Sequence, residues 1–165
     1  IGEEGMLLVT GPNVMAGYLG KPEATAAVMQ GGWYVTGDVA RLDAEGHVTL
    51  TGRLSRFAKI AGEMVPLEKV EEALHECVGA ADRVCAVTCV PDESRGERVV
   101  VLFVAAMAVK DARSWCEALA GRLPSLWTPS HRDFHGVDEL PVLGSGKLDL
   151  RGVKELALSL AGTAR

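Results

Sequence analysis

The chain has 165 residues, of which 48% are hydrophobic and 24% charged, and this composition excludes the disordered and fibrous classes. Its net charge of −5 and its aromatic content of 5% argue against a nucleic-acid-binding protein, which would carry a basic excess and stacking side chains. No signal peptide is visible, and no apolar run approaches the roughly 20 residues that a membrane-spanning helix needs.

Residues 1–52 predict mainly β-structure. Residues 6–10 form an apolar run before Gly-Pro-Asn, which is typical of a short strand that ends in a turn. Residues 22–29 start with Pro and Glu and predict a short helix. Residues 39–42 and 47–51 are rich in β-formers and flank Asp-Ala-Glu-Gly, a pattern that predicts a hairpin. This part is too short to close a hydrophobic core alone.

The pattern changes after residue 55. A second hairpin is predicted first, with strands at 57–60 and 64–65 around a Gly-containing turn. A helix follows over residues 67–77, because apolar residues recur there at steps of three and four. On the face opposite this apolar stripe we place the four glutamates of the helix: Glu68, Glu71, Glu72 and Glu76.

The rest of the chain predicts a small sheet with helices packed on it, so the fold class is α+β. The strand at 83–90 is expected to stop at Pro91, and the more hydrophobic strand at 98–106 is expected to be central among about three strands. The other predicted elements are a helix over 111–123 with Asp111 as N-cap, an edge strand over 132–137, a loop over 140–147 and a helix over 153–160.

None of the four cysteines belongs to a C-x-x-C pair, and each has apolar neighbours: Cys77, Cys85, Cys89 and Cys116. Zinc sites use closely spaced Cys and His ligands, so we expect no metal site here. Reduced, partly buried thiols of a cytosolic protein agree better with the pattern.

Three segments contain more polar residues and glycines than packing alone requires. Asp38, directly after Thr-Gly, can present its carboxylate to two vicinal hydroxyls, although an ordinary Asp turn has the same sequence. The forked donors of Arg53 can reach a ribose or a phosphate, although a surface arginine is the alternative. Lys147 follows Gly-Ser-Gly on a pliable loop, and its ammonium suits a carboxylate or phosphate oxygen. The spacing is not that of a P-loop.

In order and separation these segments resemble motifs of the adenylate-forming superfamily, which includes acyl-CoA synthetases, luciferases and the adenylation domains of peptide synthetases. The resemblance rests on residues 34–38, on Gly52-Arg53 and on Gly146-Lys147, and residues 5–11 and 17–19 extend it upstream. It covers nearly the whole chain in the right order.

Residues 56–65 and 141–147 further resemble the bifunctional 2-acylglycerophosphoethanolamine acyltransferase/acyl-acyl carrier protein synthetase subfamily. Most members of the superfamily carry Arg or Lys shortly after the glycine at position 62, whereas Glu63 and Met64 follow it here. The resemblance implies a ligase that uses ATP with Mg²⁺ to activate a fatty acid and transfers it to acyl carrier protein, in the recycling of phospholipid acyl chains.

The resemblance also implies roles for single residues. Asp38 would hold the ribose hydroxyls, and Arg53 would lie near the ribose and phosphate. Lys147 would be the catalytic group that bridges the acyl carboxylate and the α-phosphate, since it neutralises charge as two anions approach. The superfamily hinge corresponds to Leu54 and Ser55, where many relatives carry Asp or Lys in place of Ser55.

The implied domain organisation has three parts. Residues 1–52 would end the large adenylation domain, residues 53–55 would be the hinge, and residues 56–165 would be a small lid domain that rotates between the half-reactions. The phosphate loop, the acyl pocket and the Mg²⁺ ligands belong to the large domain upstream. A chain that starts within a longer protein, without an initiator Met, is therefore expected, and it should be inactive alone.

After the rotation, a basic hairpin would face the thioester step and the carrier protein, with Arg56, Lys59 and Gly62 as its contact residues. The implied location is the cytoplasm, with the full-length protein at the cytoplasmic face of the inner membrane and a lysophospholipid as a further substrate.

Three alternatives to this functional interpretation are left open. The chain could come from a fatty acyl-CoA synthetase or a peptide-synthetase adenylation domain, it could be a non-catalytic carrier-binding module, or it could be an unrelated α+β protein whose motifs match by coincidence.

Overall fold

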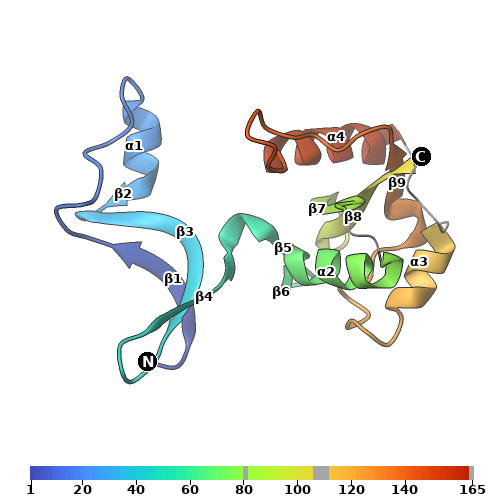
Figure 1. The fold of residues 1–165 in the computed structure, drawn as a ribbon, viewed down its shortest axis with the longest axis horizontal. Coiled ribbons are helices and arrows are strands. Elements are labelled where there is room, and N and C mark those ends of the chain that lie inside the picture. The colour runs from blue at the N-terminus through green and yellow to red at the C-terminus, as the bar shows by residue number, and fades with distance from the viewer. Residues whose placement is uncertain (80–81, 106–111, 164–165) are drawn as a thin grey trace. The chain divides into compact units, whose positions relative to one another are not determined.

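The computed structural model of the chain describes residues 1–79, 82–105 and 112–163. The chain divides into two compact units, Ile1–Ser55 and Arg56–Arg165 (Figure 1). The first unit contains β1 (Glu4–Val9), α1 (Pro22–Val28), β2 (Met29–Gln30), β3 (Trp33–Leu42) and β4 (Val48–Arg53). They are followed by η1 (Leu54–Arg56), β5 (Phe57–Ile60), β6 (Glu63–Pro66), α2 (Leu67–Val78), β7 (Cys85–Asp92), β8 (Gly96–Val104), α3 (Ala112–Leu119), η3 (His131–Asp133), β9 (Phe134–Val137) and α4 (Leu150–Thr163).

The first unit is an antiparallel sheet in which β3 pairs with β1, β2 and β4. The predicted strand, short helix and hairpin are confirmed, but β3 begins at Trp33 and so takes in the Thr-Gly-Asp segment. Every residue from 1 to 55 stays at least partly exposed. As expected, this unit has no buried core of its own.

The second unit is built on a mixed sheet with the order β6-β5-β8-β7, in which β9 also pairs with β8 in parallel. β8 is central, as its hydrophobic sequence predicted. The β5–β6 hairpin joins the sheet through the pairing of Ile60 with Gly96. The α+β class is confirmed, with a sheet larger than the expected three strands because the hairpin is continuous with it.

The sheet of the second unit separates two hydrophobic clusters. Alternate residues of β7 and β8 point to opposite faces, as the strand period requires. One face packs on α2 and α3, where Leu74 and Trp115 are fully buried. The other face packs on α4 through Val153 and Ala157. Figure 1 shows the same three layers, with α4 on one side of the strands and α2 and α3 on the other.

Several boundaries differ from the sequence-based expectation. β7 continues through Pro91 to Asp92, because β7 lies at the edge of the sheet, where the missing N–H of proline costs no ladder hydrogen bond. α4 starts at Leu150 rather than residue 153. α3 ends at Leu119 rather than residue 123, and its expected N-cap, Asp111, lies outside the described residues. Trp115 and Leu119 of this helix are buried. No helix in the described parts of the chain has the length and hydropathy to cross a bilayer.

Candidate functional site

Asp38 lies in an irregular stretch of β3. The register between β1 and β3 shifts between Met6 and Leu8, so extra residues of β3 lie opposite Leu7. Gly37 has φ +79°, a conformation that glycine adopts without strain. The Thr36 hydroxyl donates to the Leu7 carbonyl oxygen at 2.9 Å and accepts the Asp38 N–H at 3.0 Å. The Thr-Gly-Asp segment is therefore a fixed bulge rather than a free turn.

A second bulge brings Arg53 opposite Asp38. The register of β3 with β4 pairs Ala40 with Leu50 but Val39 with Gly52, so it skips Thr51. Asp38 then pairs with Arg53. In a regular register that paired Thr51 with Val39, Asp38 would lie opposite Gly52 and Arg53 would point to the other face of the sheet, because side chains alternate along a strand.

The two side chains form an ion pair in which Arg53 Nε lies 3.2 Å from Asp38 Oδ1. The side chains remain 59% and 32% exposed respectively, so both keep free hydrogen-bonding capacity toward a ligand. Nearby, the hydroxyl of Tyr18 raises the pKa of the Tyr34 phenol. A carboxylate that accepts from two hydroxyls, next to a cation for a phosphate, is suited to a ribose 5′-phosphate.

Lys147 projects from a loop that is closed by backbone hydrogen bonds. Val142 and Leu148 form a β-bridge. The Leu143 N–H donates to the Lys147 carbonyl oxygen at 2.8 Å, and the Gly146 N–H donates to the Leu143 carbonyl oxygen at 2.8 Å. The expected pliable loop is thus a small hairpin with its lysine exposed.

Arg56 differs from the expectation of an exposed, carrier-facing cation. It ends η1 and is only 6% exposed. Its guanidinium donates to Glu71 Oε2 at 2.7 Å and to the Val87 carbonyl oxygen at 2.8 Å. Glu71 was placed on the solvent face of α2 but is only 8% exposed, because it also accepts from Arg83 and from the Val87 N–H. Arg56 therefore belongs to the core of the second unit.

The β5–β6 hairpin holds the other two residues assigned to the carrier-facing surface. Lys59 and Gly62 are both exposed. The turn is tight, with φ +49° at Ala61 and +87° at Gly62. The Lys59 N–H donates to Glu97 Oε2 at 2.6 Å, so the neighbouring strand anchors the backbone while the ammonium stays in solvent.

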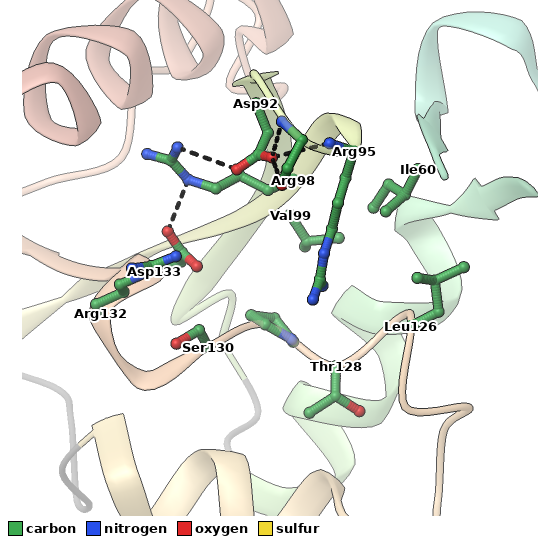
Figure 2. A pocket seen from close by; sticks show the side chains of 12 residues that line it. Ile60, Asp92, Arg95, Arg98, Val99, Leu126, Thr128, Ser130, Arg132 and Asp133 are labelled. Atoms are coloured by element: carbon green, nitrogen blue, oxygen red, sulfur yellow. Dashed lines mark hydrogen bonds and ion pairs between the residues drawn. The ribbon is translucent and has the colours of Figure 1, made fainter. Parts of the chain in front are cut away.

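Sequence reasoning missed a polar pocket of about 290 Å³ in the second unit, which Figure 2 shows. Arg98 pairs there with Asp133 at 2.9 Å and with Asp92 at 3.8 Å. The Ser94 hydroxyl and backbone hydrogen bonds lower the pKa of Asp92. Among the described residues, no ion pair is found for the other two arginines of the lining, Arg95 and Arg132. Three arginines and two aspartates give the lining a net charge of +1, and both aspartates pair with Arg98.

No local signal in the sequence marks this pocket, because its arginines come from segments more than 30 residues apart that meet only through the pairing of β8 and β9.

The described residues contain no cluster of His, Cys, Asp or Glu side chains that could hold a metal ion. The four cysteines are free thiols. Burial raises the pKa of Cys85 to about 12 and that of Cys89 to about 11.

The arrangement of the second unit is that of the C-terminal domain of adenylate-forming enzymes. The relatives of this chain are acyl- and aryl-CoA ligases and other adenylate-forming enzymes. Feruloyl-CoA synthase from Amycolatopsis is 38% identical over 148 residues, which cover 89% of this chain and 29% of that protein. A long-chain-fatty-acid–CoA ligase from Bacillus subtilis is 36% identical over 154 residues, covering 93% and 27%.

Solved structures agree with these relatives. The o-succinylbenzoate CoA synthetase of Bacillus subtilis, in complex with its acyl-adenylate intermediate, matches with a TM-score of 0.70 and 31% identity over 88% of this chain and 29% of that one. The chain thus spans less than a third of the length of these proteins. No profile of a known protein family matches the sequence.

Proposed function

We propose that this chain is the C-terminal portion of an ATP-dependent acid–thiol ligase. The ligase joins a carboxylic acid to the α-phosphate of ATP, releases pyrophosphate, and then passes the acyl group from AMP to a thiol. The observation that carries the proposal is the Asp38–Arg53 pair, which two bulges present on an exposed face of the first sheet. A ribose and its phosphate need this combination of acceptor and cation.

The exposed apolar side chains of the first unit support the proposal that another part of the full-length ligase packs against its sheet. Apolar side chains of three strands are left exposed: Met6, Leu8, Leu42, Val48 and Leu50. A unit that buries none of its residues is not expected to fold alone. In the proposed ligase this sheet completes a large adenylation domain, which also supplies the acyl pocket and the ligands of the Mg²⁺ that accompanies ATP. Residues 1–52 belong to that domain, and residues 56–165 form the mobile one.

The proposed role of Lys147 is electrostatic. Its ammonium neutralises charge as the carboxylate approaches the α-phosphate, and this approach brings two anions together. The bridged loop holds the lysine backbone in one place, so little freedom is lost when the site assembles. The loop and the nucleotide pair are on different units, so a swing at Leu54 and Ser55 would bring Lys147 to the site for one half-reaction and remove it for the other.

The thiol acceptor is proposed to be CoA. Its three phosphates suit a pocket with two arginines that form no ion pair within the described part of the chain, Arg95 and Arg132, and with hydroxyl-bearing residues beside them (Figure 2). The named relatives that are CoA ligases favour the same acceptor. Of the acids that these relatives use, we propose a fatty acid, in agreement with the one whose name specifies a long-chain fatty acid.

The experiment is to compare Lys147→Ala with the unmodified full-length ligase in each half-reaction. Acid-dependent ATP–pyrophosphate exchange should fall at least about 100-fold, the usual cost of losing a preorganised charge. Thioester formation from preformed acyl-adenylate should change little. Equal loss of both steps, or normal exchange, contradicts the proposed role. The 165-residue chain alone should show no exchange, and robust exchange would contradict the proposal that most of the ATP site lies elsewhere.

Acyl carrier protein is a second candidate acceptor, favoured by residues 56–65 with their exposed Lys59. It would place the ligase in phospholipid recycling at the cytoplasmic face of the inner membrane, with a lysophospholipid as final acceptor. A direct comparison of CoA and acyl carrier protein separates the candidates. Lys59→Glu should weaken only the carrier reaction, and more so at low salt. Arg95→Ala and Arg132→Ala should raise the KM for CoA.

A further inference from the structure

The end of the lysine loop is also the start of α4, and Asp149 belongs to both. Its N–H donates to the Pro141 carbonyl oxygen at 2.9 Å and so completes the hairpin around Lys147. Its carboxylate accepts the N–H groups of Arg151 and Gly152, each at 3.1 Å. These are donors of the first helical turn, which have no partner inside a helix. One residue therefore joins the loop to the helix.

The helix that receives this cap is fixed in the core. Val153 and Ala157 of α4 are fully buried against β7 and β8. Leu140 and Leu148, on either side of the loop, pack in the same cluster. Both flanks of the loop are therefore anchored in the core. The cap at Asp149, two residues after Lys147, then sets the direction in which the loop leaves the helix.

Gly152 makes room for the cap. A Cβ at this position would lie 2.9 Å from Asp149 Oδ2 and 3.0 Å from the Cβ of Pro141. Gly152 is in the first turn of α4, where glycine is about 1 kcal/mol less favourable than alanine. Its φ is not in the left-handed region, so backbone freedom does not account for it. The close approach of the Asp149 carboxylate and Pro141 does.

We propose that Asp149 and Gly152 are positioning residues for Lys147. Asp149 ties the lysine hairpin to the first turn of α4, and Gly152 leaves the space in which its carboxylate and Pro141 fit. The backbone of Lys147 is thereby held in one place relative to the sheet, and this sets the position from which its ammonium extends. This inference rests on the proposed role of Lys147 in acyl-adenylate formation, and it adds the residues that aim the lysine.

The test compares Asp149→Ala, Asp149→Asn and Gly152→Ala in the full-length ligase. A misplacement of about 1 Å can cost about 100-fold in rate, so Asp149→Ala and Gly152→Ala should lower the kcat of ATP–pyrophosphate exchange at least about 10-fold. Thioester formation from preformed acyl-adenylate should stay within about twofold of the unmodified ligase. Asn also caps helices, so Asp149→Asn should recover most of the exchange rate.

Matched controls come from the same helix. Gly162→Ala makes the same substitution where no atom of the described residues lies within 4 Å of the new Cβ, and it should leave both steps unchanged. Arg151→Ala removes the surface pair with Glu155 and keeps the cap. In the 165-residue chain, Asp149→Ala should also speed hydrogen exchange at the Leu143 and Gly146 amides, a measurement that does not depend on activity.

Two results would overturn the inference. In one, Asp149→Ala and Gly152→Ala leave the exchange rate unchanged. In the other, both half-reactions fall in parallel with the melting temperature, which would make the residues structural only. Lys147→Ala, measured alongside, separates the two proposals. If Lys147→Ala abolishes exchange while the cap variants do not, the positioning role alone fails; if Lys147→Ala keeps exchange, the proposed function fails.

Discussion

Arg56 and Glu71 form a buried ion pair, with 2.7 Å between the guanidinium nitrogen and the carboxylate oxygen. It joins the first residue of the second unit to α2. Both groups also bond the backbone of Val87, whose C=O accepts from Arg56 and whose N–H donates to Glu71. Val87 lies in β7, at the edge of the sheet that the described residues form, so the pair satisfies backbone groups of Val87 that face away from β8.

We therefore expect Glu71→Gln to destabilise the second unit by about 3 kcal/mol, because it leaves the buried Arg56 with only the half-exposed Glu68 carboxylate, 3.6 Å away, as an ionic partner. Urea unfolding of the chain measures this effect. The neighbouring Glu72 is the control, since its pair with Lys69 is exposed on both sides and Glu72→Gln should cost less than about 1 kcal/mol. Equal effects of the two substitutions would contradict the structural role given to Arg56.

The pair also shows what the sequence could and could not predict. The apolar period placed α2 correctly, because a helix period is a local property. It placed Glu71 on the solvent face, because a charged residue is usually exposed unless it is paired. The two partners of Glu71, Arg56 and Arg83, are 15 and 12 residues away in the sequence, so a local period does not reveal them. Asp38 and Arg53 were predicted singly, but their pairing depends on the bulge at Thr51. A hairpin with a regular register would place the two side chains on opposite faces of the sheet.

The turn glycines of the second unit should differ in how they tolerate a side chain. Gly62 and Gly96 have φ of +87° and +83°, so an alanine at either position should cost about 1–2 kcal/mol in backbone strain. At Gly96 the new Cβ would also lie 3.3 Å from the Lys59 carbonyl oxygen, whereas at Gly62 nothing is within 4 Å. Gly96→Ala should therefore be the more destabilising in urea titrations. A larger effect of Gly62→Ala would contradict the close approach of β5 and β8.

The buried thiols should be unreactive at neutral pH. Burial raises the pKa of Cys85 to about 12, and burial together with a hydrogen bond to Glu97 raises that of Cys89 to about 11. The thiolate is the reactive form, so iodoacetamide at pH 8 should spare both residues until the chain is unfolded in urea. Mass spectrometry of tryptic peptides reads this out, and rapid labelling of Cys85 in the native chain would contradict its burial.

The same shifts predict how stability depends on pH. A raised thiol pKa means that the unfolded chain loses its proton first, so the contribution of each thiol to stability is complete below about pH 8.5. It is then lost as the pH rises toward 11 for Cys89 and 12 for Cys85. Replacing both by alanine should flatten the fall in the free energy of unfolding between pH 9 and pH 11 relative to the unmodified chain.

The Asp38–Arg53 pair should matter for nucleotide and little for stability. The pair is exposed, so Asp38→Asn should change the free energy of unfolding by less than about 1 kcal/mol. In the full-length ligase the same substitution should raise the KM for ATP about 10-fold or more, because a charge-assisted hydrogen bond is worth about 1.5–3 kcal/mol. An unchanged KM would contradict a ribose contact.

Deleting Thr51 tests whether the bulge is needed beyond placing the two side chains opposite each other. The deletion leaves a regular register in which Val39 still lies opposite Gly52 and Asp38 still lies opposite Arg53, because only the extra residue is removed. We therefore expect the KM for ATP to stay close to that of the unmodified ligase, whereas Arg53→Ala should raise it. Thr51→Ala is the control, because it keeps the extra residue and loses only the 3.3 Å hydrogen bond to the Val39 carbonyl oxygen. If the deletion raises the KM as much as Arg53→Ala while circular dichroism shows an intact sheet, pairing of the two residues is not sufficient, and the bulge itself must orient them toward the nucleotide.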